Sequence, residues 1–331
     1  MSTDLNALIV SFRDATQYWV LSLGSDKISQ VQASEVANPL GELLNLTKLI
    51  RAHTTKVGII FKPETLKKEP TTAYNTLEKL SQTLILTISV IAQLKPSDIS
   101  VIFYEELLSQ TRQLIESSHE LAKELLLIYE DDNDEGRLVS VGKVWANCDS
   151  MTKVINDGAL GLLTEKIKQS IVLVDDGFDE FAEWTENPES VDDPFGFSDD
   201  EEEDGEEQLG EKEEQSEEEE DNTELIAYAK DSLNKIKLVK LLLASCKKSL
   251  PKSTTPAQIN EIYRLQKSIV IHIDEFIVDL MLERAVTSKV DSLMTQISTE
   301  SKSLAKIVQA IHVQDAKKSA WYKTWITKYD T

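Results

Sequence analysis

The chain has 331 residues, of which 41% are hydrophobic, and a formal net charge of −23. This length is enough for two ordinary domains, each with its own core. The charge is local, because the segment from Asp175 to Asp221 holds 25 acidic residues and one lysine, while the rest of the chain is nearly balanced. The net negative charge therefore reflects one acidic segment, and it does not describe the surface of the rest of the chain.

Cysteine usage and hydropathy indicate the cellular compartment of the protein. Cys148 and Cys246 form no C-x-x-C pair and no disulfide framework, which is typical of a reducing compartment. No apolar run approaches the ~20 residues of a membrane-spanning helix. The first twenty residues do not have the pattern of a signal peptide. We expect a cytoplasmic or nuclear protein with no membrane span.

The first half of the chain shows helical periodicity almost throughout. Pro96-Ser97-Asp98 separates the third helix from the fourth, with Ser97 or Asp98 as an N-cap. The only strand-like stretch is VGIIF at 57–61, which a helix end or a turn explains equally well. The predicted helices cover about 3–22, 35–53, 71–94, 97–130, 137–156 and 159–184.

An acidic segment interrupts this pattern. Low hydrophobicity and high charge leave too little apolar surface to offset the ordering entropy, so residues 186–222 are predicted to be disordered. The simplest interpretation is a solubilising tether. A second interpretation is a linear motif for a groove with a basic rim, anchored by Phe195 and Phe197. The residues of this candidate motif are Asp193, Pro194, Phe195, Gly196 and Phe197. Acidic residues follow three serines, which makes them candidate phosphorylation sites: Ser190, Ser198 and Ser216.

The last part of the chain, residues 257–331, contains neither glycine nor proline. Its apolar residues recur every seventh position, with Glu283 as the one gap, and this predicts a long helix in a bundle. Pro251 and Pro256 separate it from the helix before it. The recurring residues are Ile262, Ile269, Phe276, Val290, Ile297, Leu304 and Ile311. The sequence thus predicts an all-α protein of antiparallel helical bundles: an N-terminal bundle at 1–185, the acidic linker at 186–222, and a C-terminal unit at 223–331 that packs on the first.

Motifs of catalysis and metal binding are not found. No nucleophile elbow, phosphate-binding loop or dinucleotide fingerprint occurs, and the four histidines lie singly in helical patterns. His119-Glu120 begins like a zinc-protease motif, but Lys123 stands where the second histidine ligand belongs. The stretch from Asp131 begins like a calcium loop, but its twelfth position is Gly142, which cannot supply the bidentate carboxylate. We expect no enzyme activity, no metal and no cofactor.

Basic residues give little support to nucleic-acid binding, because they are spread along helices. The exceptions are ASCKKS at 244–249 and DAKKSAWYKTWITK at 315–328. The second run could suit an anionic partner, but a terminal helix with packed aromatics and solvated lysines is the favoured interpretation. Its members are Lys317, Lys318, Lys323 and Lys328 with Trp321, Tyr322 and Trp325.

Three stretches occur in a distinctive order: VGKVWANCDSMTKV at 141–154, then DDGFDEFAEW, then DDPFGFSDDEE. This layout resembles the cyclin-D-binding protein family (GCIP-like, also called Maid or HHM), in particular its fungal members. The resemblance implies an all-helical fold similar to vinculin and α-catenin domains, no catalysis, and binding to regulatory proteins. Trp145, Cys148 and Asp149 match the family motif, and the spacing of Trp145 and Cys148 indicates that both point into the core.

The leading hypothesis is a helical interaction protein that regulates cell-cycle or transcription factors. An alternative is an acidic chaperone for basic proteins such as histones, acting through residues 199–221. A third is a trafficking adaptor that uses the Asp-Pro-Phe element at 193–195.

Overall fold

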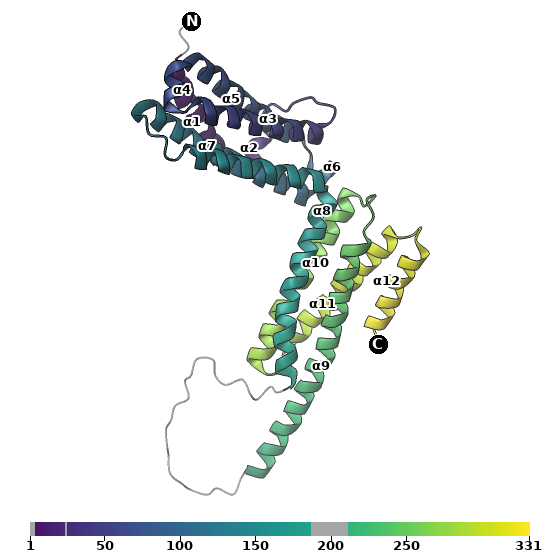
Figure 1. Ribbon diagram of the computed structural model, residues 1–331. Coiled ribbons are helices and arrows are strands. Elements are labelled where there is room, and N and C mark those ends of the chain that lie inside the picture. Colours follow the sequence, from purple (N-terminus) through teal and green to yellow (C-terminus); the bar gives the residue numbers. More distant parts are fainter. Residues whose placement is uncertain (1–3, 24, 187–210) are drawn as a thin grey trace, which may run out of the picture. The chain divides into compact units, whose positions relative to one another are not determined.

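The computed structural model describes residues 4–23, 25–186 and 211–331, except for the side chains of 25–26 and 211–222. Every regular element in these ranges is a helix (Figure 1), which confirms the predicted all-α fold. The helices are α1 (Leu5–Ser22), α2 (Ser25–Ile28), α3 (Pro39–Ile60), α4 (Pro63–Lys68), α5 (Pro70–Gln93), α6 (Pro96–Ile99), α7 (Val101–Asp131), α8 (Arg137–Glu186), α9 (Glu211–Ser249), α10 (Pro256–Glu283), α11 (Ser288–Ile311) and α12 (Ala316–Tyr329).

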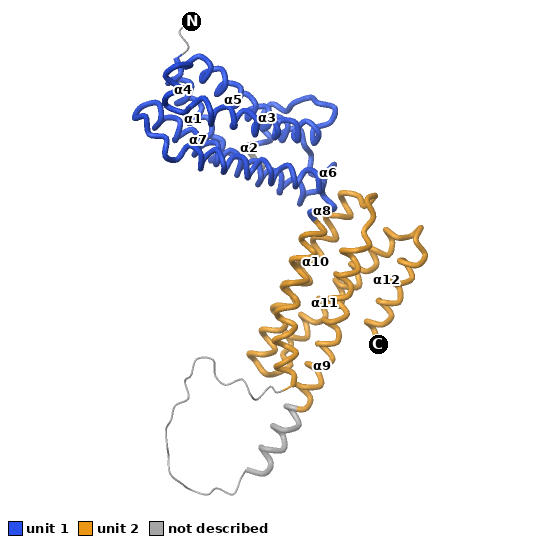
Figure 2. Tube along the Cα trace, viewed as in Figure 1, with its two compact units in different colours: residues 1–162 blue, residues 163–331 orange. Residues whose placement is uncertain are grey.

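The chain divides into two compact units, residues 1–162 and 163–331 (Figure 2). This differs from the predicted division, which placed all residues up to 185 in the first bundle. The physical reason lies in the second half of α8, whose apolar side chains pack within the second unit. Phe181 of α8 meets Phe276 of α10 edge to face, with ring centroids 6.0 Å apart. The acidic segment therefore interrupts the second unit instead of separating the two.

Helix α8 leaves helical geometry at Gly158, between its two predicted halves. The backbone there has φ 66° and ψ −175°, a combination that is essentially restricted to glycine. The predicted boundary between helices at 137–156 and 159–184 is thus confirmed at this residue. Helix α9 begins at Glu211, so the last part of the segment predicted to be disordered is helical, while residues 187–210 lie outside the described residues.

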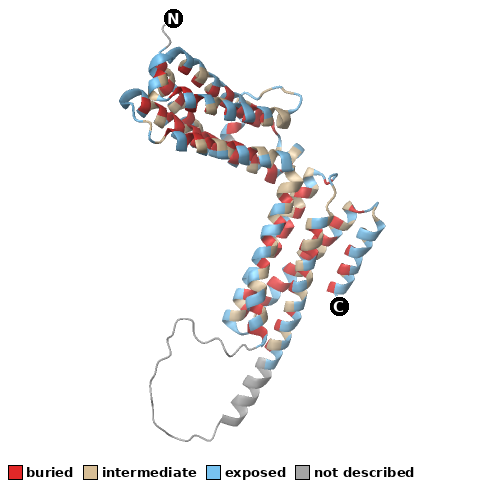
Figure 3. Cartoon of the chain, in the orientation of Figure 1, coloured by how far each residue is buried: buried red, intermediate tan, exposed pale blue. Residues whose placement is uncertain are grey.

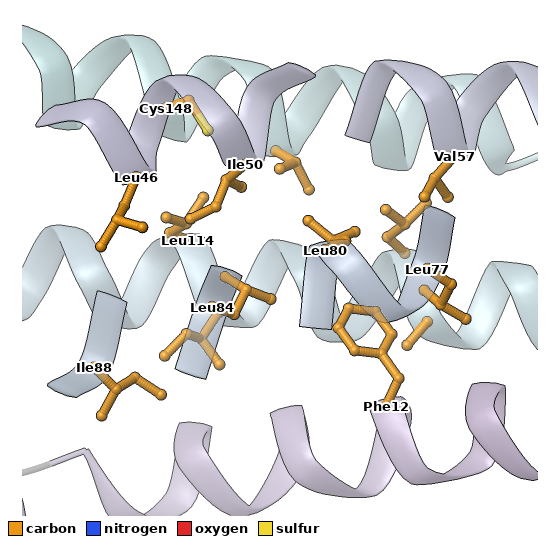
Figure 4. Close-up of a cluster of buried hydrophobic side chains, with 14 of the residues drawn as sticks. Phe12, Leu46, Ile50, Val57, Leu77, Leu80, Leu84, Ile88, Leu114 and Cys148 are labelled. Carbon is orange, nitrogen blue, oxygen red and sulfur yellow. The ribbon is translucent and has the colours of Figure 1, made fainter. Parts of the chain in front are cut away.

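The first unit packs the apolar faces of α1, α3, α5, α7 and the start of α8 around one core. Figure 4 shows this core, with leucine, isoleucine and phenylalanine side chains from separate helices interdigitating. The labelled members are Phe12, Leu46, Ile50, Val57, Leu77, Leu80, Leu84, Ile88, Leu114 and Cys148. The helical spacing of apolar residues in the sequence accounts for these faces.

Two local expectations in the first unit need correction or refinement. The N-cap of α7 is Ser100, whose hydroxyl accepts from the Phe103 amide, and not Ser97 or Asp98, which lie in the short helix α6. The strand-like VGIIF stretch begins within the last turn of α3, so its helix-end interpretation is the right one.

The expected long helix after Pro256 is divided into α10, α11 and α12. Helix α10 begins with a capping box at Thr255 and Gln258, and it ends at Glu283, after which the C-cap residue Arg284 adopts a left-handed conformation with φ 47°. Thr287 then caps α11 by accepting from the Val290 amide. In Figure 3 buried residues follow one side of these helices and exposed residues the other, as a bundle requires. The gap at Glu283 in the apolar repeat marks this turn.

Candidate interaction surfaces

The family-motif residues lie in the first half of α8, against α3. Cys148 is buried in the core of the first unit (Figure 4), and burial raises the pKa of its thiol to about 12. Trp145 is half-buried, and the Arg51 guanidinium lies 5.4 Å from its ring centroid. Arg51 Nε also donates to Asp149 Oδ1 at 3.1 Å. These contacts hold α8 against α3, so the motif residues stabilise the packing of these two helices.

The predicted linear motif and phosphorylation sites lie where the structure gives no side-chain geometry. Residues 193–197, Ser190 and Ser198 lie outside the described residues, and Ser216 lies in α9 within the part whose side chains are not described. All of these stay predictions.

A shallow hollow of about 610 Å³, with several polar residues in its lining, lies between α1, α7 and α8 of the first unit. It contains a serine and a histidine, Ser117 and His119, but these do not pair with each other. The Ser117 hydroxyl donates to the Leu114 carbonyl, while His119 Nδ1 lies 3.2 Å from both Thr16 Oγ1 and the Arg13 carbonyl. The two side chains thus support helix packing in this arrangement.

The acidic turn after α7 uses its carboxylates in pairs with basic side chains. Asp132 binds Lys67 Nζ at 2.5 Å, and Asp134 accepts from Arg137 at 3.2 Å. Asn133 Oδ1 accepts from the Glu135 amide, which closes a tight turn. Within the described ranges, no group of three metal-ligating side chains occurs here or elsewhere.

The structure brings the two basic runs of the sequence together on α9 and α12. A hollow of about 370 Å³ between them is lined by Lys317, Lys318 and Trp321, and the Trp321 side chain is 40% exposed. Trp325 is buried instead and donates to the Leu238 carbonyl at 2.8 Å. The favoured interpretation of a packed terminal helix therefore fits Trp325, while Trp321 stays accessible.

Next to this hollow lies a polar network that sequence reasoning missed. Ser249 Oγ is 2.7 Å from Tyr322 Oη and 3.1 Å from His312 Nε2. Burial, assisted by the charge of Lys318, lowers the pKa of His312, so the neutral imidazole is favoured. Ser249 is the last residue of α9, His312 is the C-cap of α11, and Tyr322 lies in the middle of α12. Their separation along the chain explains why no local pattern indicated them. Their hydrogen bonds join α9, α11 and α12.

An apolar groove lies between the second half of α8 and α10. It contains a hollow of about 220 Å³ lined by Leu173, Val174, Gly177, Val270, Ile271, Ile273, Asp274 and Ile277. Leu173 is 64% exposed and Ile271 45% exposed, although both are large apolar side chains. Gly177 also lines the hollow, and a Cβ added there would make ordinary van der Waals contact with Ile277 Cδ1 at 3.5 Å.

The exposed apolar surface continues along α10 beyond this hollow. Ile271, Val278 and Leu282 are spaced by seven and four residues, which places them on the same side of the helix. This stripe spans about three helical turns, or roughly 16 Å. The groove residues of α8 and those of α10 lie more than 90 positions apart in the sequence, for example Leu173 and Val270, so only the fold brings them together.

These features define an all-helical protein of two bundles with an accessible apolar groove. Residues 42–187 match the family model described as Grap2 and cyclin-D-interacting, N-terminal. This match confirms the resemblance to the family that the motifs at 141–203 predicted.

Two fungal relatives extend the similarity over most of the chain. The uncharacterized protein YLR287C of Saccharomyces cerevisiae is 26% identical over 324 residues, covering 92% of this chain and 89% of the relative. The uncharacterized protein C22E12.18 of Schizosaccharomyces pombe is 23% identical over 300 residues, covering 89% and 85%. Among the described residues, no helix has the length and apolar character needed to cross a membrane.

Proposed function

We propose that this protein is a non-enzymatic helical interaction module that binds regulatory proteins of the cell cycle or of transcription. The observation that carries the proposal is the groove between α8 and α10. The Leu173 side chain is 64% exposed and the Ile271 side chain 45% exposed, and both line an apolar hollow that Gly177 also lines. Exposed apolar grooves between helices are typical sites for a helix of a partner protein.

The match to the family model supports the same proposal. The description of the matched family names interaction with Grap2 and cyclin D, and the match includes the α8 wall of the groove, residues 173–177. The α10 wall lies beyond the matched residues. We infer that this chain, like the proteins for which the family model is named, acts by binding other proteins.

The direct test is affinity capture from a yeast extract with the full-length chain and with Leu173→Glu. Leu173 is so exposed that the substitution should leave the fold intact. Leu241→Glu is the matched control, because Leu241 is 52% exposed on α9 and does not line the groove. We expect proteins captured by the wild type and by Leu241→Glu to be lost with Leu173→Glu. Equal capture by all three chains would reject the groove as the binding site.

The rival function, an acidic chaperone for basic proteins, makes a different prediction in the same assay. A chain lacking residues 198–210 keeps helix α9 as it stands from Glu211 onwards. Our proposal expects this chain to retain the groove-dependent partners. If instead the deletion removes histones or other basic proteins from the captured set, and Leu173→Glu does not, the chaperone function is the better account.

A further inference from the structure

The apolar groove between α8 and α10 has a charged rim. Asp274 lines the hollow directly. On α8, Asp176 lies three residues after Leu173 and Glu180 three residues after Gly177, so both are helix-surface neighbours of groove residues. All three carboxylates are exposed, and none of them forms an ion pair with another described residue. The rim therefore presents unpaired negative charge next to apolar surface.

The charge is graded along the groove. Lys267 lies three residues before Val270 and is exposed, so a positive charge stands at the end where the hollow begins. The acids Asp274 and Glu180 stand further along each helix. Since Phe181 meets Phe276 and Leu173 lines the hollow together with Val270, the two helices run in the same direction with matched positions. The acidic end of the groove therefore lies toward the C-terminal ends of α8 and α10.

We propose that the groove binds an amphipathic helix of a partner protein whose apolar face is flanked by lysine or arginine. The basic flank of that helix lies over Glu180 and Asp274, and its apolar face covers Leu173 and Ile271. This inference rests on the proposed function and specifies the chemistry of the partner. Charge complementarity of this kind selects partners and orients them more than it adds affinity.

The same charges argue against the chain's own acidic segment as the occupant. Residues 187–210 carry only acidic charges, which would meet the carboxylates of the rim. Like charges in register at an interface are unfavourable. The length of the exposed stripe from Ile271 to Leu282, about three helical turns, instead suits a short helix lying along α10.

The test uses three synthetic amphipathic helices with one leucine face and either lysine, glutamine or glutamate on the flanks. Binding to the full-length chain is measured by fluorescence anisotropy at low and at high salt. We expect the lysine peptide to bind about tenfold more tightly than the glutamine peptide at low salt. Each exposed ion pair contributes less than about fivefold in affinity, so two or three pairs with the rim carboxylates together account for this preference. High salt should remove most of this preference. Equal binding of the lysine and glutamine peptides at low salt would overturn the proposal.

Variants of the rim connect the preference to named residues. Asp274→Lys should weaken the lysine peptide about fivefold, and the double variant Glu180→Lys with Asp274→Lys should make the glutamate peptide the tighter ligand. Glu224→Lys, an exposed acid on α9, is the matched control and should leave the preference unchanged. Circular dichroism of each variant checks folding. If a charge-reversed chain does not fold, Asp274→Asn should still reduce the lysine preference, and an unchanged preference would overturn the proposal.

The outcomes separate this inference from the function on which it rests. If all three peptides bind equally and Leu173→Glu abolishes binding, the groove is a docking site but the basic partner is wrong. If Leu173→Glu has no effect on any peptide, the groove itself is wrong and both proposals fail. Peptide-independent dimerisation that Leu173→Glu prevents would identify a second copy of this chain as the occupant.

Discussion

Replacing Gly177 by alanine should change stability and binding in opposite directions. Glycine inside a helix costs about 0.5–1 kcal/mol relative to alanine. The new Cβ would lie 3.5 Å from Ile277 Cδ1, which is ordinary van der Waals contact and introduces no strain. The free energy of unfolding should therefore rise by about 0.5–1 kcal/mol, which raises the Tm by about 1–4 °C for a unit of this size.

The same methyl group would be added to the lining of the hollow, which a bound partner helix would cover. Adding a methyl to a well-packed contact costs about 1–3 kcal/mol, which corresponds to a loss of affinity from about fivefold to about a hundredfold. Differential scanning calorimetry gives the Tm, and anisotropy with the leucine–lysine peptide gives the affinity.

Gly142→Ala is the control for this experiment. Gly142 lies in the first half of α8, and an added Cβ there meets nothing within 4 Å. We expect the same gain from helix propensity without a change in binding. A stable Gly177→Ala chain that binds the peptide as tightly as the wild type would refute the assignment of the groove, and a lowered Tm would refute the reasoning about Ile277.

Three further results follow from the packing. Cleavage within 187–210 should leave two fragments that co-elute in gel filtration, because residues 163–186 contribute to the core of the second unit. Salt at about 0.5 M screens charge attraction between the fragments. Folded fragments that elute separately would contradict this expectation. Cys148 and Cys246 should resist Ellman's reagent at about pH 8 in the native chain and react in guanidinium, since burial raises both thiol pKa values to about 12; rapid native labelling would show that they are accessible. The pKa of His312 is lowered below its ordinary 6.5 in the folded chain, so the stability that the neutral side chain contributes is present above pH 6.5 and is lost as the pH falls below that value. The Tm of His312→Gln should therefore fall less steeply between about pH 7 and 5 than the Tm of the wild type.

Local patterns predicted most of the helices, because each helix buries one periodic apolar face. The spacing of apolar residues predicted which faces of α5 and α7 are buried. The two predicted segments at 137–156 and 159–184 correctly lie on either side of Gly158. The turn after Glu283 was not recognised as a break. Arg284 adopts a left-handed conformation there without the glycine that usually indicates such a position.

The unit boundary and the groove depend on tertiary packing and could not be predicted. The acidic composition at 186–222 suggested a border between domains, but Phe181 and Phe276 pack across that interruption. In the same way, Leu173 resembles any core leucine in the sequence, and its exposure beside α10 is evident only in the folded unit. The polar network around Ser249 is a further case, because its members meet only in the folded unit.

Photo-crosslinking from the groove would test the central claim most directly. A photoreactive phenylalanine analogue is placed at position 271 of the full-length chain, with position 241 on α9 as the control site, and crosslinked peptides are identified by mass spectrometry. We predict that position 271 captures a partner segment with an apolar helical face and flanking lysine or arginine, and that position 241 does not. Crosslinks from position 271 to residues 187–222 of the same chain, or an identical set of products from both positions, would contradict the account.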